Sequence, residues 1–124
     1  MIRPVSAQAS IAVSDLDRAK AFYGGALGLT VKEERPDGVI YEAGDAAFLV
    51  YPSQFAGTNK STSMAFDVDD LDAAVKELTD AGVKLEEYDF PGLKTVNGIA
   101  EIEGLRSGWF KDPDGNILAI GQRT

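Results

Sequence analysis

Carboxylates are the candidate acid–base groups of this chain, because its 124 residues include neither histidine nor cysteine. Without histidine a Ser-His-Asp triad cannot form. Without cysteine there is no thiol nucleophile, disulfide or zinc–thiolate site. Three pairs of glutamates lie close together in the sequence, namely Glu33/Glu34, Glu86/Glu87 and Glu101/Glu103.

The Glu101/Glu103 pair stands near the end of an irregular stretch, residues 90–105, that contains Pro91 and several glycines. Such a composition predicts a loop or a lid. A glutamate buried there could act as a general base. Glu101 and Glu103 are therefore the only candidates for a catalytic role, but the sequence predicts no catalytic residue. The alternative for all three pairs is solvated surface charge.

Composition and charge exclude several classes of function. The chain is 44% hydrophobic and 26% charged, as expected of one globular domain, and its formal net charge is −8. So acidic a surface repels phosphate backbones, and we expect no nucleic-acid partner. No apolar run could span a bilayer, and no signal peptide follows Met1. We therefore expect a cytoplasmic protein without membrane association.

The chain repeats a short phrase at an offset of 55 residues. Asp-Leu-Asp-x-Ala occurs at 15–19 and again at 70–74. Each copy follows a β-type alternation and opens an apolar stripe of helical period. Asp15 and Asp70 are predicted to be helix N-caps, because a carboxylate accepts the free N–H groups of the first turn.

Each repeat predicts a β-α-β-β-β module. Gly28 and Gly82 stand where the two helices would end in a left-handed residue. The strands expected after the helices are 30–35, 38–43 and 46–51 in the first half, and 84–89, 106–111 and 116–121 in the second. The expected boundaries are one domain, 1–124, with modules at 1–52 and 61–124 and a linker at 53–60. The fold class is α+β: two βαβββ modules form a curved mixed sheet, with helices on the outer face.

Two further phrases carry a family resemblance. The first helix reads Asp-Leu-Asp-Arg-Ala-x-x-Phe-Tyr and is followed by Leu27-Gly28-Leu29, and residues 110–116 read Phe-x-Asp-Pro-Asp-Gly-Asn. Together with the doubled module, they resemble the vicinal oxygen chelate superfamily. That superfamily includes glyoxalases, extradiol dioxygenases, fosfomycin-resistance enzymes and bleomycin-resistance proteins. The resemblance covers essentially the whole chain and is specific for the fold, but it leaves the function open.

The resemblance implies where a metal would be held. Enzymes of this superfamily commonly place a ligand on the first strand of each half and another on the last strand. The corresponding positions here are Gln8, Ser63, Ala119 and either Phe48 or a neighbour up to Tyr51. Transition metals need imidazole or carboxylate donors, which an amide, a hydroxyl and apolar side chains do not supply. We therefore expect no metal and no cofactor.

Strand alternation predicts a concave face that contains Gln8, Ser63 and Ala119, while the opposite face is apolar and suits the core. We call the space enclosed by this concave face the cup. On the penultimate strand Phe110 should join the core, so Trp109 and Ser107 should point into the cup. The predicted ligand-binding residues are Gln8, Phe48, Tyr51, Ser63, Phe90, Leu93, Ser107, Trp109 and Ala119. Small and aromatic side chains suit a planar organic ligand. The alternative for Trp109 is that it fills the cup by packing.

Three functions remain open on the sequence alone. The first is a metal-independent protein that sequesters an aromatic or cationic small molecule such as an antibiotic; its resemblance to bleomycin-resistance proteins implies a homodimer. The second is a lyase or isomerase that uses Glu101, Glu103 or an atypical metal. The third is a partner or regulatory module with a vestigial cup. The replaced metal ligands favour binding without catalysis.

Overall fold

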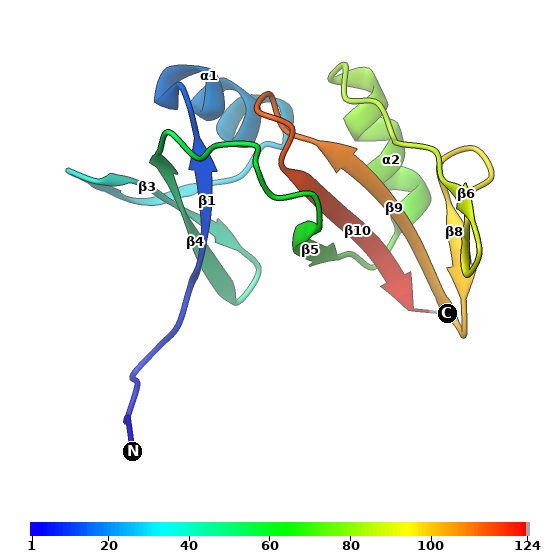
Figure 1. Cartoon of the computed structure of the whole chain (residues 1–124), viewed down its shortest axis with the longest axis horizontal. Helices are drawn as coiled ribbons and strands as arrows, with labels where there is room; N and C mark the ends of the chain where they lie inside the picture. The colour runs from blue at the N-terminus through cyan, green and yellow to red at the C-terminus, as the bar shows by residue number, and fades with distance from the viewer. Residues whose placement is uncertain (124) are drawn as a thin grey trace. The chain divides into compact units, whose positions relative to one another are not determined.

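The computed structural model describes residues 1–123, and the chain divides into two compact units, Met1–Ala56 (unit 1) and Gly57–Thr124 (unit 2). Each unit contains a four-stranded mixed sheet with a helical segment after its first strand (Figure 1). The fold is therefore α+β with two modules, as predicted. Within residues 1–123 no helix is long and apolar enough to cross a membrane.

Unit 1 follows the predicted order of elements. They are β1 (Ala9–Val13), α1 (Leu16–Lys20), the π-helix η1 (Ala21–Ala26), β2 (Val31–Arg35), β3 (Gly38–Ala43) and β4 (Ala46–Pro52). The strand order in the sheet is β1-β4-β3-β2. The first and last strands pair in parallel, and the remaining pairs are antiparallel.

An aromatic core lies between the sheet and the helical segment of unit 1. Tyr23 from η1, Tyr41 from β3 and Phe48 from β4 are each at most 1% exposed. Their ring centroids lie 5.7–6.0 Å apart. Burial raises the pKa of the Tyr41 phenol, and nearby Lys20 opposes that shift in part. These rings identify the helix-covered face of the sheet.

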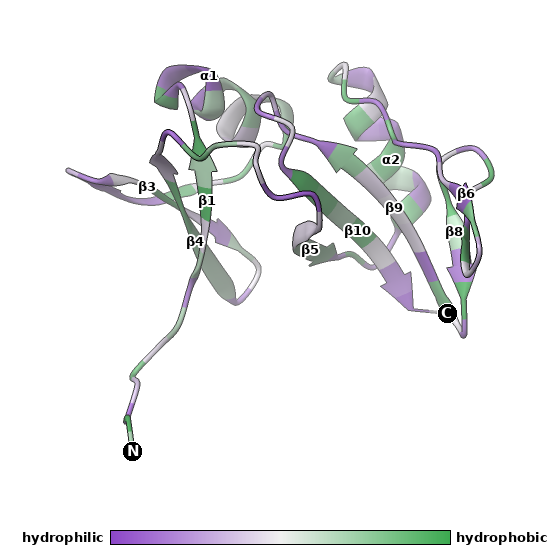
Figure 2. Cartoon of the chain, in the orientation of Figure 1, coloured by the Kyte–Doolittle hydropathy of each residue, from purple (hydrophilic) through white to green (hydrophobic). Residues whose placement is uncertain are grey.

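Unit 2 repeats the plan with additional short strands. Its elements are β5 (Thr62–Asp67), α2 (Leu71–Asp80), β6 (Asp89–Phe90), β7 (Leu93–Lys94), β8 (Ala100–Ile102), β9 (Leu105–Lys111) and β10 (Ile117–Arg123). The sheet order is β5-β10-β9-β8, again with the first and last strands parallel. Strand β10 is hydrophobic over most of its length and hydrophilic at its end (Figure 2). Strands β6 and β7 form a separate hairpin.

The predicted strand at 84–89 is wrong. Glu86 N donates to Trp109 O at 2.7 Å, so the segment touches β9, but it does not continue as a strand. The fourth position in the sheet is taken instead by β8, which pairs with Leu105–Ser107. The segment leaves β9 because Glu87 and Tyr88 bond to residues of the following loop.

The predicted helix ends are confirmed. Asp15 Oδ1 accepts from Arg18 N at 3.1 Å, and Asp70 Oδ1 accepts from Ala73 N at 3.0 Å. Gly28 and Gly82 follow the helices with φ of +69° and +86°, a conformation that glycine adopts without strain. These local signals set where each helix begins and ends.

Candidate functional site

The two faces of the unit 1 sheet can be told apart from the register of β3 with β4. Tyr41 pairs with Phe48 in the core, and Ile40 pairs with Leu49. Because successive side chains alternate, Ile40 and Leu49 point to the face without the helix. Phe48, predicted to line the ligand site, lies instead in the helix-covered core at 1% exposure, and its neighbour Leu49 is on the helix-free face. All seven residues of β4 are apolar, so the strand has no polar alternation from which to predict which side chains face the core.

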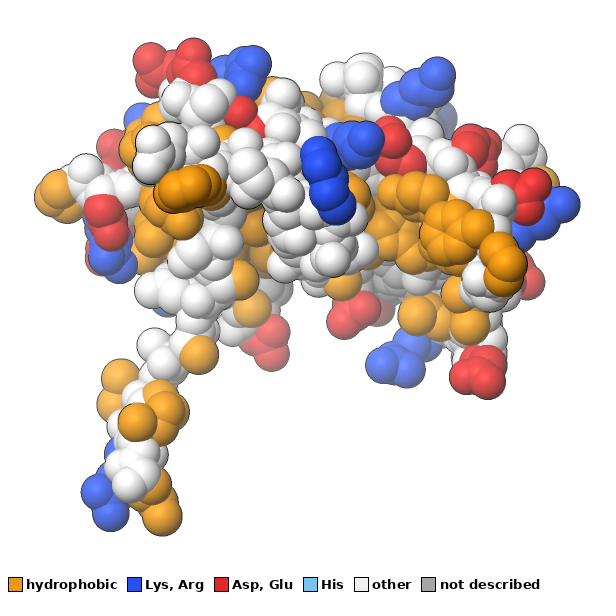
Figure 3. All heavy atoms as spheres, viewed as in Figure 1, with side chains coloured by type: hydrophobic (Ala, Val, Ile, Leu, Met, Phe, Trp, Pro, Cys, Tyr) orange, Lys and Arg blue, Asp and Glu red, His pale blue; other side chains and the backbone are white. Residues whose placement is uncertain are grey.

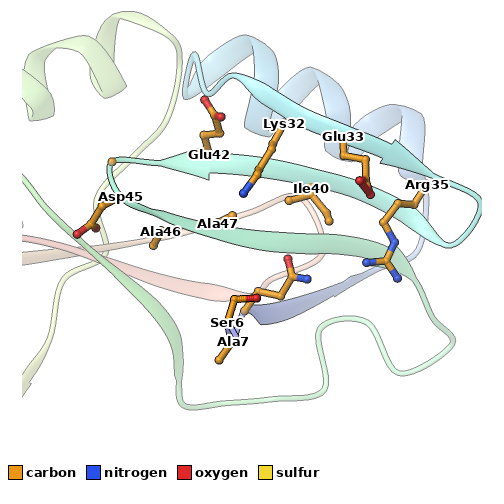
Figure 4. A pocket seen from close by; sticks show the side chains of 12 residues that line it. Ser6, Ala7, Lys32, Glu33, Arg35, Ile40, Glu42, Asp45, Ala46 and Ala47 are labelled. Atoms are coloured by element: carbon orange, nitrogen blue, oxygen red, sulfur yellow. The ribbon is translucent and has the colours of Figure 1, made fainter. Parts of the chain in front are cut away.

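A hollow of about 430 Å³ lies on this helix-free side of unit 1. Gln8 lines it from just before β1, together with Ile40 of β3. Arg35 and Ile40 reach from β2 and β3 toward the segment that contains Ser6 (Figure 4). The predicted residue Gln8 thus lies in a real concavity.

The hollow of unit 1 is richer in carboxylates than in cations. Glu33, Glu42 and Asp45 line it, with Lys32 and Arg35 as the cations. Arg35 already forms two hydrogen bonds with the carboxylate of Asp37, at 2.9 and 2.8 Å, which offset much of its charge. The remaining balance favours a cationic group, although exposure and salt screen the attraction. The sequence did not indicate a site at Lys32, Arg35, Glu42 or Asp45, and Glu33 was considered there only as one of the glutamate pairs. Strand alternation from Ile40 would have indicated Glu42.

The helix-free face of unit 2 contains Trp109. Phe110 is 1% exposed in the core, so its neighbour Trp109 points to the opposite side, where Ala119 is its partner across the sheet. Ser107 shares this face, two residues along β9. Ser63 lies at a bulge between β5 and β10, and its Oγ accepts from Asn59 Nδ2 at 3.1 Å. The structure therefore places Ser107, Trp109 and Ala119 on one face, as predicted.

Three rings form an aromatic cluster on unit 2, which we define as Tyr88, Phe90 and Trp109. The Tyr88 ring lies 5.7 Å from the Trp109 ring at 80°, and 5.9 Å from the Phe90 ring at 63°. Phe90 is 51% exposed. Figure 3 shows hydrophobic side chains gathered over the region of β6 and β9. Leu93 pairs with Phe90 in the same hairpin.

Sequence reasoning missed Tyr88, the central ring of the aromatic cluster. Its position two residues before Phe90 in an extended segment was the available signal, because side chains two residues apart share a face. Tyr88 was instead absorbed into the strand expected at 84–89. Its contact with Trp109 depends on how that segment turns away from β9.

Comparison with known proteins decides the family. The sequence model of the Glyoxalase/Bleomycin resistance protein/Dioxygenase superfamily matches residues 6–120. The chain belongs to this superfamily. The predicted resemblance to vicinal oxygen chelate proteins is thereby confirmed. No curated protein sequence matches the chain.

Solved structures of similar fold share little sequence with the chain. UcmS2 is 18% identical with a TM-score of 0.75, and the match covers 97% of this chain and 98% of that one. The fosfomycin resistance protein FosX of Listeria monocytogenes is 16% identical at a TM-score of 0.72, covering 100% and 96%. A glyoxalase/bleomycin resistance protein/dioxygenase from Alicyclobacillus acidocaldarius is 20% identical at 0.71, covering 99% and 95%. At these identities the likeness shows the fold alone.

The residues at the superfamily's metal positions do not fit a transition metal. Gln8, Ser63 and Ala119 offer an amide, a hydroxyl and a methyl group, and register places Leu49 at the fourth position. Imidazole or carboxylate donors are required there. In the part of the chain that the structure describes, no three acidic side chains gather closely enough to hold a metal ion.

The two candidate catalytic residues, Glu101 and Glu103, do not contact the aromatic cluster. Glu101 Oε1 is 3.5 Å from Arg106 Nε, and Arg106 also bonds Asp72 of α2, so this group lies on the helix side of the sheet. The hydrogen bond to Asp72 raises the pKa of Arg106. These residues line a second hollow of about 550 Å³ beside α2. Glu103 is exposed in the turn before β9, so neither glutamate faces Trp109.

Proposed function

We propose that the protein is a metal-independent, small-molecule binding protein of the glyoxalase/bleomycin-resistance type, which acts as a cytoplasmic homodimer and sequesters an aromatic or cationic ligand. The observation that carries the proposal is the aromatic cluster on the helix-free face of unit 2. Its rings stand beside the small side chains of Ser107 and Ala119, which leave the indole face of Trp109 less crowded than large residues would.

Partial exposure of the cluster supports ligand contact over simple packing. Trp109 and Tyr88 are half-buried and Phe90 is 51% exposed, whereas Phe110, one residue along, is 1% exposed. Such partly exposed rings still present apolar surface whose burial by a ligand is favourable. Planar molecules gain further from stacking or edge-to-face contact with the rings.

The charge of unit 1 supports a cationic ligand. The hollow that Gln8 lines is also lined by Glu33, Glu42 and Asp45, and the apolar residue Ile40 forms part of its wall. A cation with an apolar body complements such a surface. Because the superfamily name includes bleomycin resistance, and similar structures include fosfomycin resistance proteins, antibiotics belong among the first compounds to test.

Tryptophan fluorescence tests this function, because Trp109 is the only tryptophan in the sequence. The full-length protein would be titrated with planar cations such as proflavine, with bleomycin and with fosfomycin, and binding would be checked by calorimetry. We expect saturable quenching of the wild type by a planar or cationic compound. Trp109→Ala contains no tryptophan, so its affinity is measured by calorimetry and should be at least about tenfold weaker, equivalent to loss of one aromatic contact. The exposed variant Phe55→Ala is the control. Absence of saturable binding across the panel would overturn the proposal.

A further inference from the structure

Glu87 fastens two points of the loop that follows it through one carboxylate oxygen. Its Oε1 accepts a hydrogen bond from Thr95 Oγ1 at 2.5 Å and another from Gly98 N at 2.9 Å. The Thr95 hydroxyl in turn accepts from Tyr88 N at 2.8 Å, and Thr95 N donates to Tyr88 O at 2.9 Å. The chain is thus closed on itself between Glu87 and Gly98.

The closure is packed as well as hydrogen-bonded. Thr95 is 8% exposed, so the hydroxyl that Glu87 bonds is sheltered from water. Gly98 has φ of +81° and is so close to Leu85 that a Cβ there would stand 2.6 Å from the Leu85 side chain. Glu87 is itself exposed, but its two hydrogen bonds are partly buried, which reduces competition from water, and hydrogen bonds to a charged acceptor are stronger than neutral ones.

The closed loop contains two rings of the aromatic cluster. Tyr88 follows Glu87 directly, and its backbone N–H and C=O both bond Thr95. Phe90 lies in the β6–β7 hairpin, which spans the residues between Tyr88 and Thr95. Fixing Thr95 and Gly98 to Glu87 therefore restricts where the rings of Tyr88 and Phe90 can stand relative to Trp109.

We propose that Glu87 is a positioning residue for ligand recognition: its carboxylate closes the 87–98 loop and so holds Tyr88 and Phe90 beside Trp109 before a ligand arrives. The inference rests on the proposed function for its consequence in binding. A preorganised ring cluster loses less conformational entropy on binding than a mobile one. On this proposal residues 87–98 form a fixed wall of the site, within the stretch around 90–105 that the sequence predicts to be a loop or a lid.

Matched variants test the role of Glu87. Glu87→Ala removes the acceptor, Glu87→Gln keeps an acceptor oxygen, and Thr95→Val removes the donor hydroxyl at nearly constant shape. Glu86→Ala is the control, because Glu86 is the adjacent carboxylate and pairs with Lys111 instead. Hydrogen exchange and the near-ultraviolet circular dichroism of Trp109 would be measured on the ligand-free protein, followed by proflavine affinity.

In Glu87→Ala we expect the Tyr88 and Gly98 amides to exchange at least about tenfold faster, and the Trp109 dichroism to weaken. Proflavine should bind at least about fivefold more weakly. Glu87→Gln should restore most of each signal, and Thr95→Val should reproduce part of the loss even if Glu87→Ala fails to fold. Exchange and dichroism like those of the wild type in Glu87→Ala, or equal changes in Glu86→Ala, would overturn the inference. If the wild type does not bind proflavine or any panel compound, the proposed function fails, while the two ligand-free measurements still decide whether Glu87 sets the rings.

Discussion

The ring of Tyr88 meets the indole of Trp109 edge-on, with centroids 5.7 Å apart and planes at 80°. An edge-to-face pair is favourable because the positive ring edge meets the negative ring face. It also keeps the two rings from lying flat against each other. The pair therefore stabilises unit 2 and shapes its helix-free face at the same time.

Replacing Tyr88 by leucine should separate these two effects. Leucine keeps apolar bulk but loses the ring, so we expect the free energy of unfolding to fall by about 1 kcal/mol and the near-ultraviolet dichroism of Trp109 to diminish. Urea unfolding and circular dichroism measure both quantities. Phe55→Leu, at a position 65% exposed, is the control. It should change the free energy of unfolding by no more than roughly 0.5 kcal/mol and should leave the dichroism of Trp109 unchanged. An unchanged Trp109 spectrum in Tyr88→Leu would mean that the contact is not formed in solution.

Asp112 should be the most costly acidic residue to replace. It is 4% exposed, and its carboxylate accepts from Asp114 N, Asn116 N and Asn116 Nδ2 at 2.8–3.0 Å. Asp112→Ala leaves these donors unsatisfied in the turn before β10, so we expect unfolding to become easier by roughly 2–4 kcal/mol. Thermal and urea unfolding provide the measurement. Asp89→Ala, on an exposed residue, is the control and should cost less than about 0.5 kcal/mol.

Gly98→Ala should be destabilising through a clash as well as through backbone strain. A Cβ at Gly98 would stand 2.6 Å from the Leu85 side chain, and φ is +81°. We expect a loss of roughly 2–4 kcal/mol. Gly92→Ala has a similar φ of +86° with open space around the Cβ, so it should cost only about 1 kcal/mol. Equal losses in the two variants would show that Leu85 does not fill the space beside Gly98.

Stability at alkaline pH should depend on Tyr41. Burial raises the pKa of its phenol, so the folded state holds the proton more tightly than the unfolded chain does. The stabilisation is fully present below the unfolded pKa of about 10 and is lost as pH rises through the higher folded value. The free energy of unfolding, measured in urea, should therefore fall less steeply between about pH 9 and pH 11 for Tyr41→Phe than for the wild type. Parallel curves would contradict the assignment.

Local signals made the helix ends predictable. Asp15 and Asp70 immediately precede their helices, and each accepts a hydrogen bond from the backbone N–H three residues further on. Gly28 and Gly82 end the helices through their own left-handed backbone conformation. Each of these signals acts within a few residues. Their repetition at a fixed offset was enough to predict the doubled module and its α+β class.

Features that depend on distant partners were not predictable in the same way. Phe48 and Leu49 belong to an unbroken apolar run in β4, so only pairing with β3 shows which of them faces the core. Tyr88 reaches Trp109 because its segment turns away from β9 and bonds Thr95. The charged hollow of unit 1 likewise requires Glu42 and Asp45 to meet residues from before β1.

The parallel pairing of β1 with β4, and of β5 with β10, has a consequence for how the chain folds during synthesis. In each unit the first strand to leave the ribosome pairs with the last strand, so the sheet is complete only after the last strand has been synthesised. Contacts between the ends of a segment form slowly, because closing the intervening chain costs entropy before the pairing contributes. Unit 1 can complete its sheet while unit 2 is still being made, and β5 then stays without its neighbour until β10 emerges.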